Sequence, residues 1–249
     1  MFRVFKVSEL SVYPYSVLMI LGGALCFVCF LVLSLIRHKE AQDETIFVSI
    51  VLVVSIIAAL PASMVVDSLF KLIETGKFEI KGATFYGGLI SAIIIFTVAL
   101  AIKRKKQVGV YERLRDLVPG ICFGHCLGRI GCFLGGCCFG SPTNSIFGVI
   151  FPEGSLPYEY YGGPVKVHPT QLYEAVFLLI LGVIFLIFNF KDSFPLYLIM
   201  YGAGRLCIEF FRNDDRGAVG LPMSPAQLIS VILIFTGAII IAVKRKKST

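Results

Sequence analysis

Long apolar runs limit how this chain can fold. A bilayer core of roughly 30 Å needs about 20 apolar residues per helix, and about seven runs approach that length. Hydrophobic residues make up 57% of the chain, above the roughly 45–50% of soluble domains. We therefore predict an all-α, polytopic integral membrane protein with about seven transmembrane helices. The expected spans are residues 16–36, 46–66, 84–102, 117–134, 168–190, 194–211 and 225–243.

The basic residues predict an orientation in the membrane. The net charge is +7, but Lys and Arg cluster between apolar runs rather than along one stripe, which argues against nucleic-acid binding. Cytoplasmic loops carry the excess of Lys and Arg, and the clusters 103–106 and 244–247 fall on one side. The C-terminus is thus predicted inside and the N-terminus outside. No internal repeat or soluble segment is visible, so residues 1–249 are interpreted as one membrane domain.

Charged side chains within these apolar runs are candidate functional residues. Arg129 lies in the glycine-rich stretch 124–140, and an arginine at membrane depth costs several kcal/mol unless it is paired or hydrated. Its anionic partner is the open question. The predicted topology brings further polar residues to the same outer face, namely Tyr86, His168, Gln171, Glu174, Arg205 and Glu209.

These residues also have structural interpretations. Arg205 and Glu209 are four residues apart, so they can form an ion pair within one helix. Alternatively, Arg129 and Arg205 form a clamp for a phosphate, whose oxygens match the guanidinium fork. His168 alone could mark the membrane boundary, and Tyr86 could be an interfacial aromatic residue.

The cysteines suggest three kinds of site. Cys132, Cys137 and Cys138, with His125 nearby, invite a zinc interpretation, but no CxxC pair is followed by a second ligand pair. We therefore predict no metal and no cofactor. A disulfide, a reactive thiol near Arg129 and plain packing of small side chains stay open.

Four sequence blocks resemble one family, the bacterial prolipoprotein diacylglyceryl transferases. The blocks are FYGGLI, GRIGCF, HPTQLYE and YGAGRLCIEFFR with the following LPMSPAQLIS. The resemblance implies a multi-pass enzyme of the bacterial cell (inner or plasma) membrane. Its reaction would move the diacylglyceryl group of phosphatidylglycerol to the lipobox cysteine thiol of a prolipoprotein, forming a thioether and releasing glycerol phosphate.

The resemblance also assigns roles to residues. Arg129 and Arg205 would hold the lipid phosphate, and Glu209 would orient Arg205. His168, Gln171 and Glu174 would belong to the substrate-binding helix at the outer face.

Two departures from the family pattern concern catalysis. The family has HGG where this chain has Tyr86 and two glycines, and Asn, Asn and Glu where it has Cys132, Gly135 and Cys137. His125, one turn before Arg129, could replace the missing base. Alternatively, the chain is a phospholipid-dependent transferase with another acceptor, or a non-catalytic lipid-binding or transport protein. A transporter would carry polar groups near the midplane, often in repeated halves, and neither feature is seen.

Overall fold

The structure is a computed structural model that describes residues 5–7, 10–12, 14–75, 108–212 and 224–248, together with residues 91, 94, 95 and 98. The expected span 84–102 falls largely outside the described residues, and so does Tyr86. The chain forms two compact units, one of residues 1–29 and 114–249 and one of residues 30–113. We call them unit 1 and unit 2. Whether they act as one membrane domain stays a prediction.

The described elements are almost all helical, as the apolar runs predict. The helices are α1 (Pro14–Arg37), α2 (Gln42–Thr75), α4 (Val110–Gly135), α6 (Thr170–Phe188), α7 (Ser193–Glu209) and α8 (Pro225–Ser248), with a 3-10 turn, η1 (Lys39–Ala41), and the short α5 (Leu156–Tyr161). The described residues also contain two two-stranded antiparallel sheets, β1 (Phe5–Val7) with β2 (Leu10–Val12) and β3 (Val149–Ile150) with β4 (Lys166–Val167).

The helices agree with a protein that crosses a membrane several times. Within the described residues, five helical segments are long and apolar enough to do so, in α1, α2, α4, α6 and α8. Helix α7 matches the expected span 194–211 but has 17 residues, about 26 Å at the helical rise and slightly less than the bilayer core. The total of seven spans and the orientation stay predictions.

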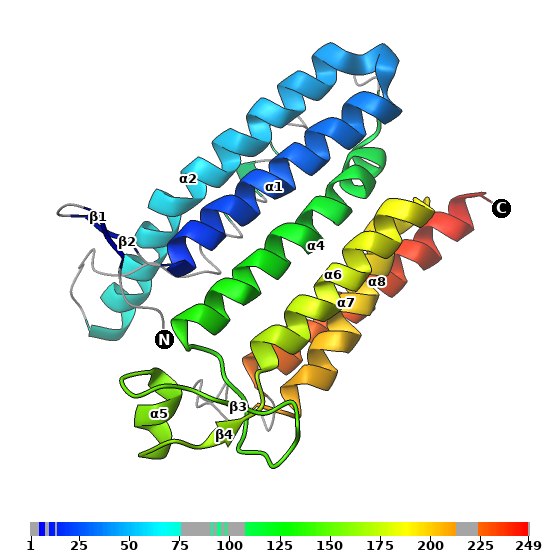
Figure 1. Ribbon diagram of the computed structural model, residues 1–249. Coiled ribbons are helices and arrows are strands. Elements are labelled where there is room, and N and C mark those ends of the chain that lie inside the picture. Colours follow the sequence, from blue (N-terminus) through cyan, green and yellow to red (C-terminus); the bar gives the residue numbers. More distant parts are fainter. Residues whose placement is uncertain are drawn as a thin grey trace. The chain divides into compact units, whose positions relative to one another are not determined.

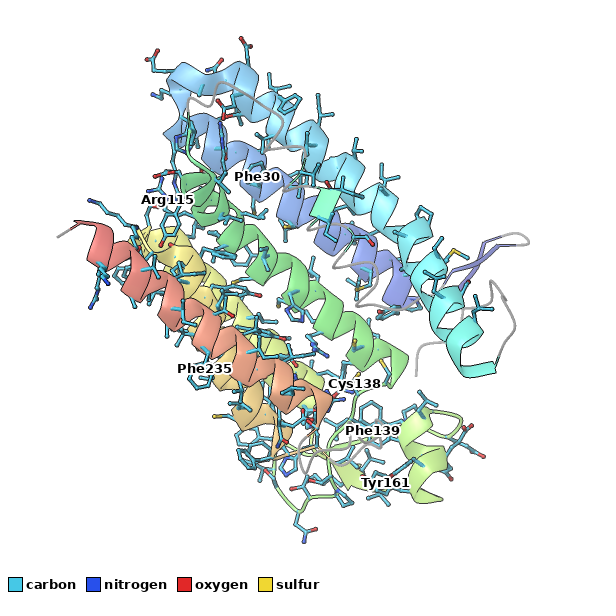
Figure 2. The ribbon with its side chains drawn as sticks, turned by 180° about the vertical axis from the view of Figure 1, so that it is seen from behind. Phe30, Arg115, Cys138, Phe139, Tyr161 and Phe235 are labelled. Atoms are coloured by element: carbon cyan, nitrogen blue, oxygen red, sulfur yellow. The ribbon has the colours of Figure 1, made fainter. Side chains whose placement is uncertain are left out.

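The exposed surface of unit 1 is apolar where a soluble protein would be polar. Ile20 on α1, Ile187 on α6 and Phe235 on α8 are 72%, 69% and 63% exposed, and Figure 2 shows Phe235 on the outside of α8. Buried positions, by contrast, include Glu174 and Arg205. Apolar side chains outside and charged ones inside are the pattern expected in lipid.

Unit 2 has a buried charge of its own. Arg113, in the first turn of α4, is 2% exposed and donates a 2.7 Å hydrogen bond from Nη1 to Thr45 Oγ1. Its Nη2 lies 3.9 Å from Glu44 Oε1. This arginine thus joins α4 to the start of α2.

Glycines allow α1 and α4 to approach closely in unit 1. A Cβ atom on Gly22 would lie 2.6 Å from the carbonyl oxygen of Gly124, and one on Gly124 would lie 2.5 Å from that of Gly22. One turn away, a Cβ on Gly120 would lie 2.6 Å from the oxygen of Cys26. Small residues spaced four apart are typical of membrane helix packing. This contact positions the half of α4 that carries His125 and Arg129.

The segment 136–169, which joins α4 to α6, folds at the end of α4 (Figure 1). It contains β3, α5 and β4 around a small core of Phe139, Phe151 and Val167. Its backbone is tied to the neighbouring helices, because Gly140 N–H donates to His168 O at 2.9 Å and Ser141 N–H donates to Phe211 O at 2.8 Å. The C-terminal ends of α4 and α7 and the N-terminal end of α6 therefore meet, as the sequence predicted.

Candidate active site

Glu174, near the start of α6, is the carboxylate on which the buried charges converge. It is 1% exposed. Its Oε1 atom lies 2.9 Å from Arg129 Nη2 and accepts a 2.9 Å hydrogen bond from Tyr201 OH. Its Oε2 atom lies 3.9 Å from Arg205 Nε. Helices α4, α6 and α7 thus meet at one carboxylate, and Arg129 has an anionic partner inside the chain.

Arg205 has a second carboxylate one turn further along α7. Its Nη2 lies 2.7 Å from Glu209 Oε2, so the ion pair expected from the spacing of four is confirmed. Glu209 Oε1 in turn accepts a 2.7 Å hydrogen bond from Ser224 Oγ, just before α8. Arg205 is therefore held between two carboxylates, which fixes the direction of its guanidinium plane.

The arginine pair keeps donors that its carboxylates do not use. Within the described residues, Arg129 Nε and Arg205 Nη1 are buried and donate to no acceptor. A buried donor without an acceptor costs about 1–3 kcal/mol. The two arginines and two glutamates balance in formal charge, so these free donors, rather than surplus charge, favour a bound oxyanion.

His125 shares the Arg129 face of α4, as its spacing of four predicts. Its Nε2 lies 3.7 Å from Glu174 Oε1, and its ring is 5.3 Å from that of Tyr201, centroid to centroid. The side chain is 30% exposed. His125 is thus beside the buried carboxylate and still open to a ligand, although its role as a base stays a prediction.

His168 and Gln171 contact groups other than the Glu174 carboxylate. His168 Nδ1 forms a 3.0 Å hydrogen bond with Tyr173 OH, and its ring packs on Phe211. Gln171 is 1% exposed and donates from Nε2 to the carbonyl of Cys137. Gln171 and Glu174 share the buried side of α6, but Gln171 supports the turn after α4. Tyr86 is outside the described residues.

That turn gathers three cysteines. The Sγ atoms of Cys132, Cys137 and Cys138 all lie within 4.8 Å of one another, and each residue is half-buried. Figure 2 shows Cys138 at the end of α4, next to Phe139 of the segment 136–169. Hydrogen bonds with the Cys132 and Cys137 thiols, and then the positive charge of Arg212, lower the pKa of the Cys138 thiol.

Comparison with known proteins decides the family. The family model described as "Prolipoprotein diacylglyceryl transferase" matches residues 3–243. The chain belongs to this family.

Curated members of the family align with the chain over different lengths. A Clostridium perfringens protein named phosphatidylglycerol--prolipoprotein diacylglyceryl transferase 2 is 35% identical over 67% of this chain and 64% of its own length. A Clostridium tetani protein named phosphatidylglycerol--prolipoprotein diacylglyceryl transferase is 36% identical over 66% of this chain and 65% of its own length. The match thus spans a little under two thirds of these two relatives. A Dehalococcoides mccartyi relative of the same name is 30% identical over 92% of this chain and 88% of its own length.

Sequence reasoning missed two residues of the site in this diacylglyceryl transferase family member. Tyr201 lies four residues before Arg205, and that helical spacing could have placed it on the same face. Ser224 begins the sequence Ser-Pro-Ala-Gln. Gln227 N–H donates to Ser224 Oγ at 3.2 Å, and Ser224 N–H donates to Gln227 Oε1 at 2.9 Å. This reciprocal capping box has a recognisable sequence signature.

Proposed function

We propose that this chain transfers the diacylglyceryl group of phosphatidylglycerol to the lipobox cysteine thiol of a prolipoprotein. The products are a thioether and glycerol phosphate. Membership of the family and the names of the relatives support this reaction. The observation that carries it is the pair of buried N–H groups on Arg129 and Arg205 that have no acceptor among the described residues.

We assign the two arginines to the phosphate of the lipid. When the thiol sulfur forms its bond to the glycerol carbon, the carbon–oxygen bond breaks and the phosphate gains a negative charge. Donors already fixed toward that oxygen stabilise the transition state more than the ground state. Glu209 orients Arg205, and Glu174 holds Arg129 against α6. His125 is the candidate base for the acceptor thiol.

The other site residues have binding roles in this proposal. His168 and Gln171 line or support the outer part of the substrate site together with Glu174, and Tyr86 stands at the family's base position. We further propose that the chain works as one domain in the bacterial cell membrane, with this site toward the outer face and the C-terminus in the cytoplasm. Phosphatidylglycerol would enter from the bilayer, to which the exposed apolar helix faces point.

The test is a product analysis with the purified protein in phosphatidylglycerol-containing vesicles and a peptide with a lipobox cysteine. Mass spectrometry should show a diacylglyceryl gain on the peptide, with equimolar glycerol phosphate. A matched peptide with serine in place of the cysteine is the control and should stay unmodified. Glycerol phosphate without a modified peptide would indicate a different acceptor. The absence of both products would contradict catalysis and would favour lipid binding alone.

A further inference from the structure

The three-cysteine cluster has the dimensions of a metal site. The three Sγ atoms lie within 4.8 Å of one another. Thiolates bound to zinc at about 2.3 Å in a tetrahedron are about 3.8 Å apart. The sulfur atoms therefore need to close by at most about 1 Å to bind one ion. The spacing of the cysteines along the sequence, which argued against zinc, does not show that the three thiols meet. They meet because the turn after α4 brings Cys137 and Cys138 back to Cys132.

Hydrogen bonds hold the turn in this shape. Cys137 N–H donates to Cys132 O at 3.1 Å, Thr170 Oγ1 donates to Cys138 O at 2.8 Å, and Gln171 Nε2 donates to Cys137 O. Cys138 has a φ of 61°, a region that residues other than glycine seldom adopt. A residue held in that region by its surroundings is a reason to look for function.

The surroundings of the cluster suit an anionic metal complex. Three thiolates and one Zn²⁺ carry a net charge of −1. Arg212 places a positive charge near Cys138, and Arg129 lies three residues before Cys132 on α4, one turn away. The three cysteines are half-buried, so a ligand can reach them.

We propose that Cys132, Cys137 and Cys138 bind one zinc ion, and that its open fourth position receives the cysteine thiol of the acceptor. Zinc sites with three protein ligands keep the fourth position for water or substrate. Within the described residues, the cluster offers three ligands. The inference rests on the proposed function for the identity of the acceptor.

In this inference the zinc ion, in place of His125, activates the acceptor thiol. A thiol that coordinates zinc loses its proton, here to water at the half-exposed cluster. The bound thiolate then donates its electron pair to the glycerol carbon of the lipid. The carbon–oxygen bond breaks, and its electron pair leaves with glycerol phosphate toward the arginines. No oxidant or reductant is needed, and zinc does not change its oxidation state.

The first experiment measures metal binding by the full-length protein in detergent after reduction and metal removal. We expect one zinc or one Co²⁺ ion per chain, with a sulfur-to-cobalt charge-transfer band. Loss of supporting groups around a metal costs 10–100-fold in affinity, so Cys132→Ser and Cys138→Ser should each weaken binding by more than about 100-fold. Cys207→Ser is the control, because this exposed cysteine lies on α7.

The second experiment tests the open position. The lipobox cysteine peptide should change the cobalt charge-transfer band, and its serine counterpart should not. Zinc binding that is equal in wild type and Cys138→Ser would overturn the proposal. So would binding of Cu(I) without zinc, or a disulfide within the cluster that excludes metal in the protein as isolated from membranes. A band that does not respond to the cysteine peptide would overturn the substrate role.

Transfer activity separates this inference from the proposed function. If metal-free wild type, or the two serine variants, modify the peptide at the wild-type rate, the reaction is right and the zinc role is wrong. If zinc binds and the cobalt spectrum responds to the peptide thiol but no lipid is transferred, the site stands and the reaction is wrong.

Discussion

Arg129 on α4 and Glu174 on α6 form a 2.9 Å ion pair, Nη2 to Oε1, in which the glutamate is 1% exposed. Tyr201 on α7 completes the contact through the same carboxylate oxygen. One acidic side chain therefore connects three helices and holds an arginine that we assign to the lipid phosphate. Charge pairs in such surroundings are costly to break from one side.

Glu174→Gln should destabilise the protein strongly. The change leaves the Arg129 guanidinium buried without its carboxylate, and breaking a buried pair from one side costs about 3–5 kcal/mol. A thermal unfolding midpoint measured in detergent should fall by several degrees. Glu159→Gln, on the exposed surface of α5, is the control and should leave the midpoint unchanged. Equal midpoints for the two variants would show that Glu174 does not hold the helices together.

Gly22→Ala should weaken the contact between α1 and α4, because its Cβ would lie 2.6 Å from the Gly124 carbonyl oxygen. Gly23→Ala is a matched control, since its Cβ meets nothing within 4 Å and alanine favours a helix by about 1 kcal/mol over glycine. We expect the unfolding midpoint to fall in the first variant and to stay or rise in the second. The reverse order would contradict this packing.

Ser224→Ala and Gln227→Ala should separate capping from positioning. Both break the capping box and should cost about 1 kcal/mol of stability. Only Ser224→Ala also removes the 2.7 Å hydrogen bond to Glu209, which holds Arg205. We expect similar unfolding midpoints but a lower kcat in Ser224→Ala alone. Equal kcat values would mean that this hydrogen bond does not tune Arg205.

His125→Ala distinguishes two ways of activating the acceptor thiol. If His125 is the base, kcat should fall by about 10²–10⁴-fold. If zinc activates the thiol, kcat should change by less than about tenfold, well below that range. Transfer rates at saturating peptide decide between them, and His38→Ala serves as a control for loss of a histidine outside the site.

The sequence predicted much of the fold because apolar length and helical spacing act locally. It placed most of the spans, the Arg205–Glu209 pair and the shared face of His125 and Arg129. Its expected spans were shorter than α2 and α4, since hydropathy detects only the apolar part of a helix and both helices begin with charged residues such as Asp43 and Glu112.

The features that the sequence did not predict depend on which segments of the chain are neighbours in space. Nothing in the spacing of one helix shows that Arg129 meets Glu174 on another, so its partner was sought outside the chain. The cysteine cluster was missed for a similar reason. Its three thiols meet across a turn in which Gly136 and Cys138 have left-handed backbone conformations, and such a conformation at a cysteine is not predictable from residue type.

The central claim is that Arg129 holds the phosphate of the donor lipid. The most direct measurement compares diacylglyceryl transfer by wild type, Arg129→Ala, Arg129→Lys and Arg115→Ala in identical vesicles. Arg115 is a matched control on the same helix, 19% exposed against 17% for Arg129. We expect Arg129→Ala to lose transfer by at least about 10²–10³-fold, Arg129→Lys to stay strongly impaired for lack of the fork, and Arg115→Ala to remain active. Wild-type transfer by a folded Arg129→Ala protein would contradict the account.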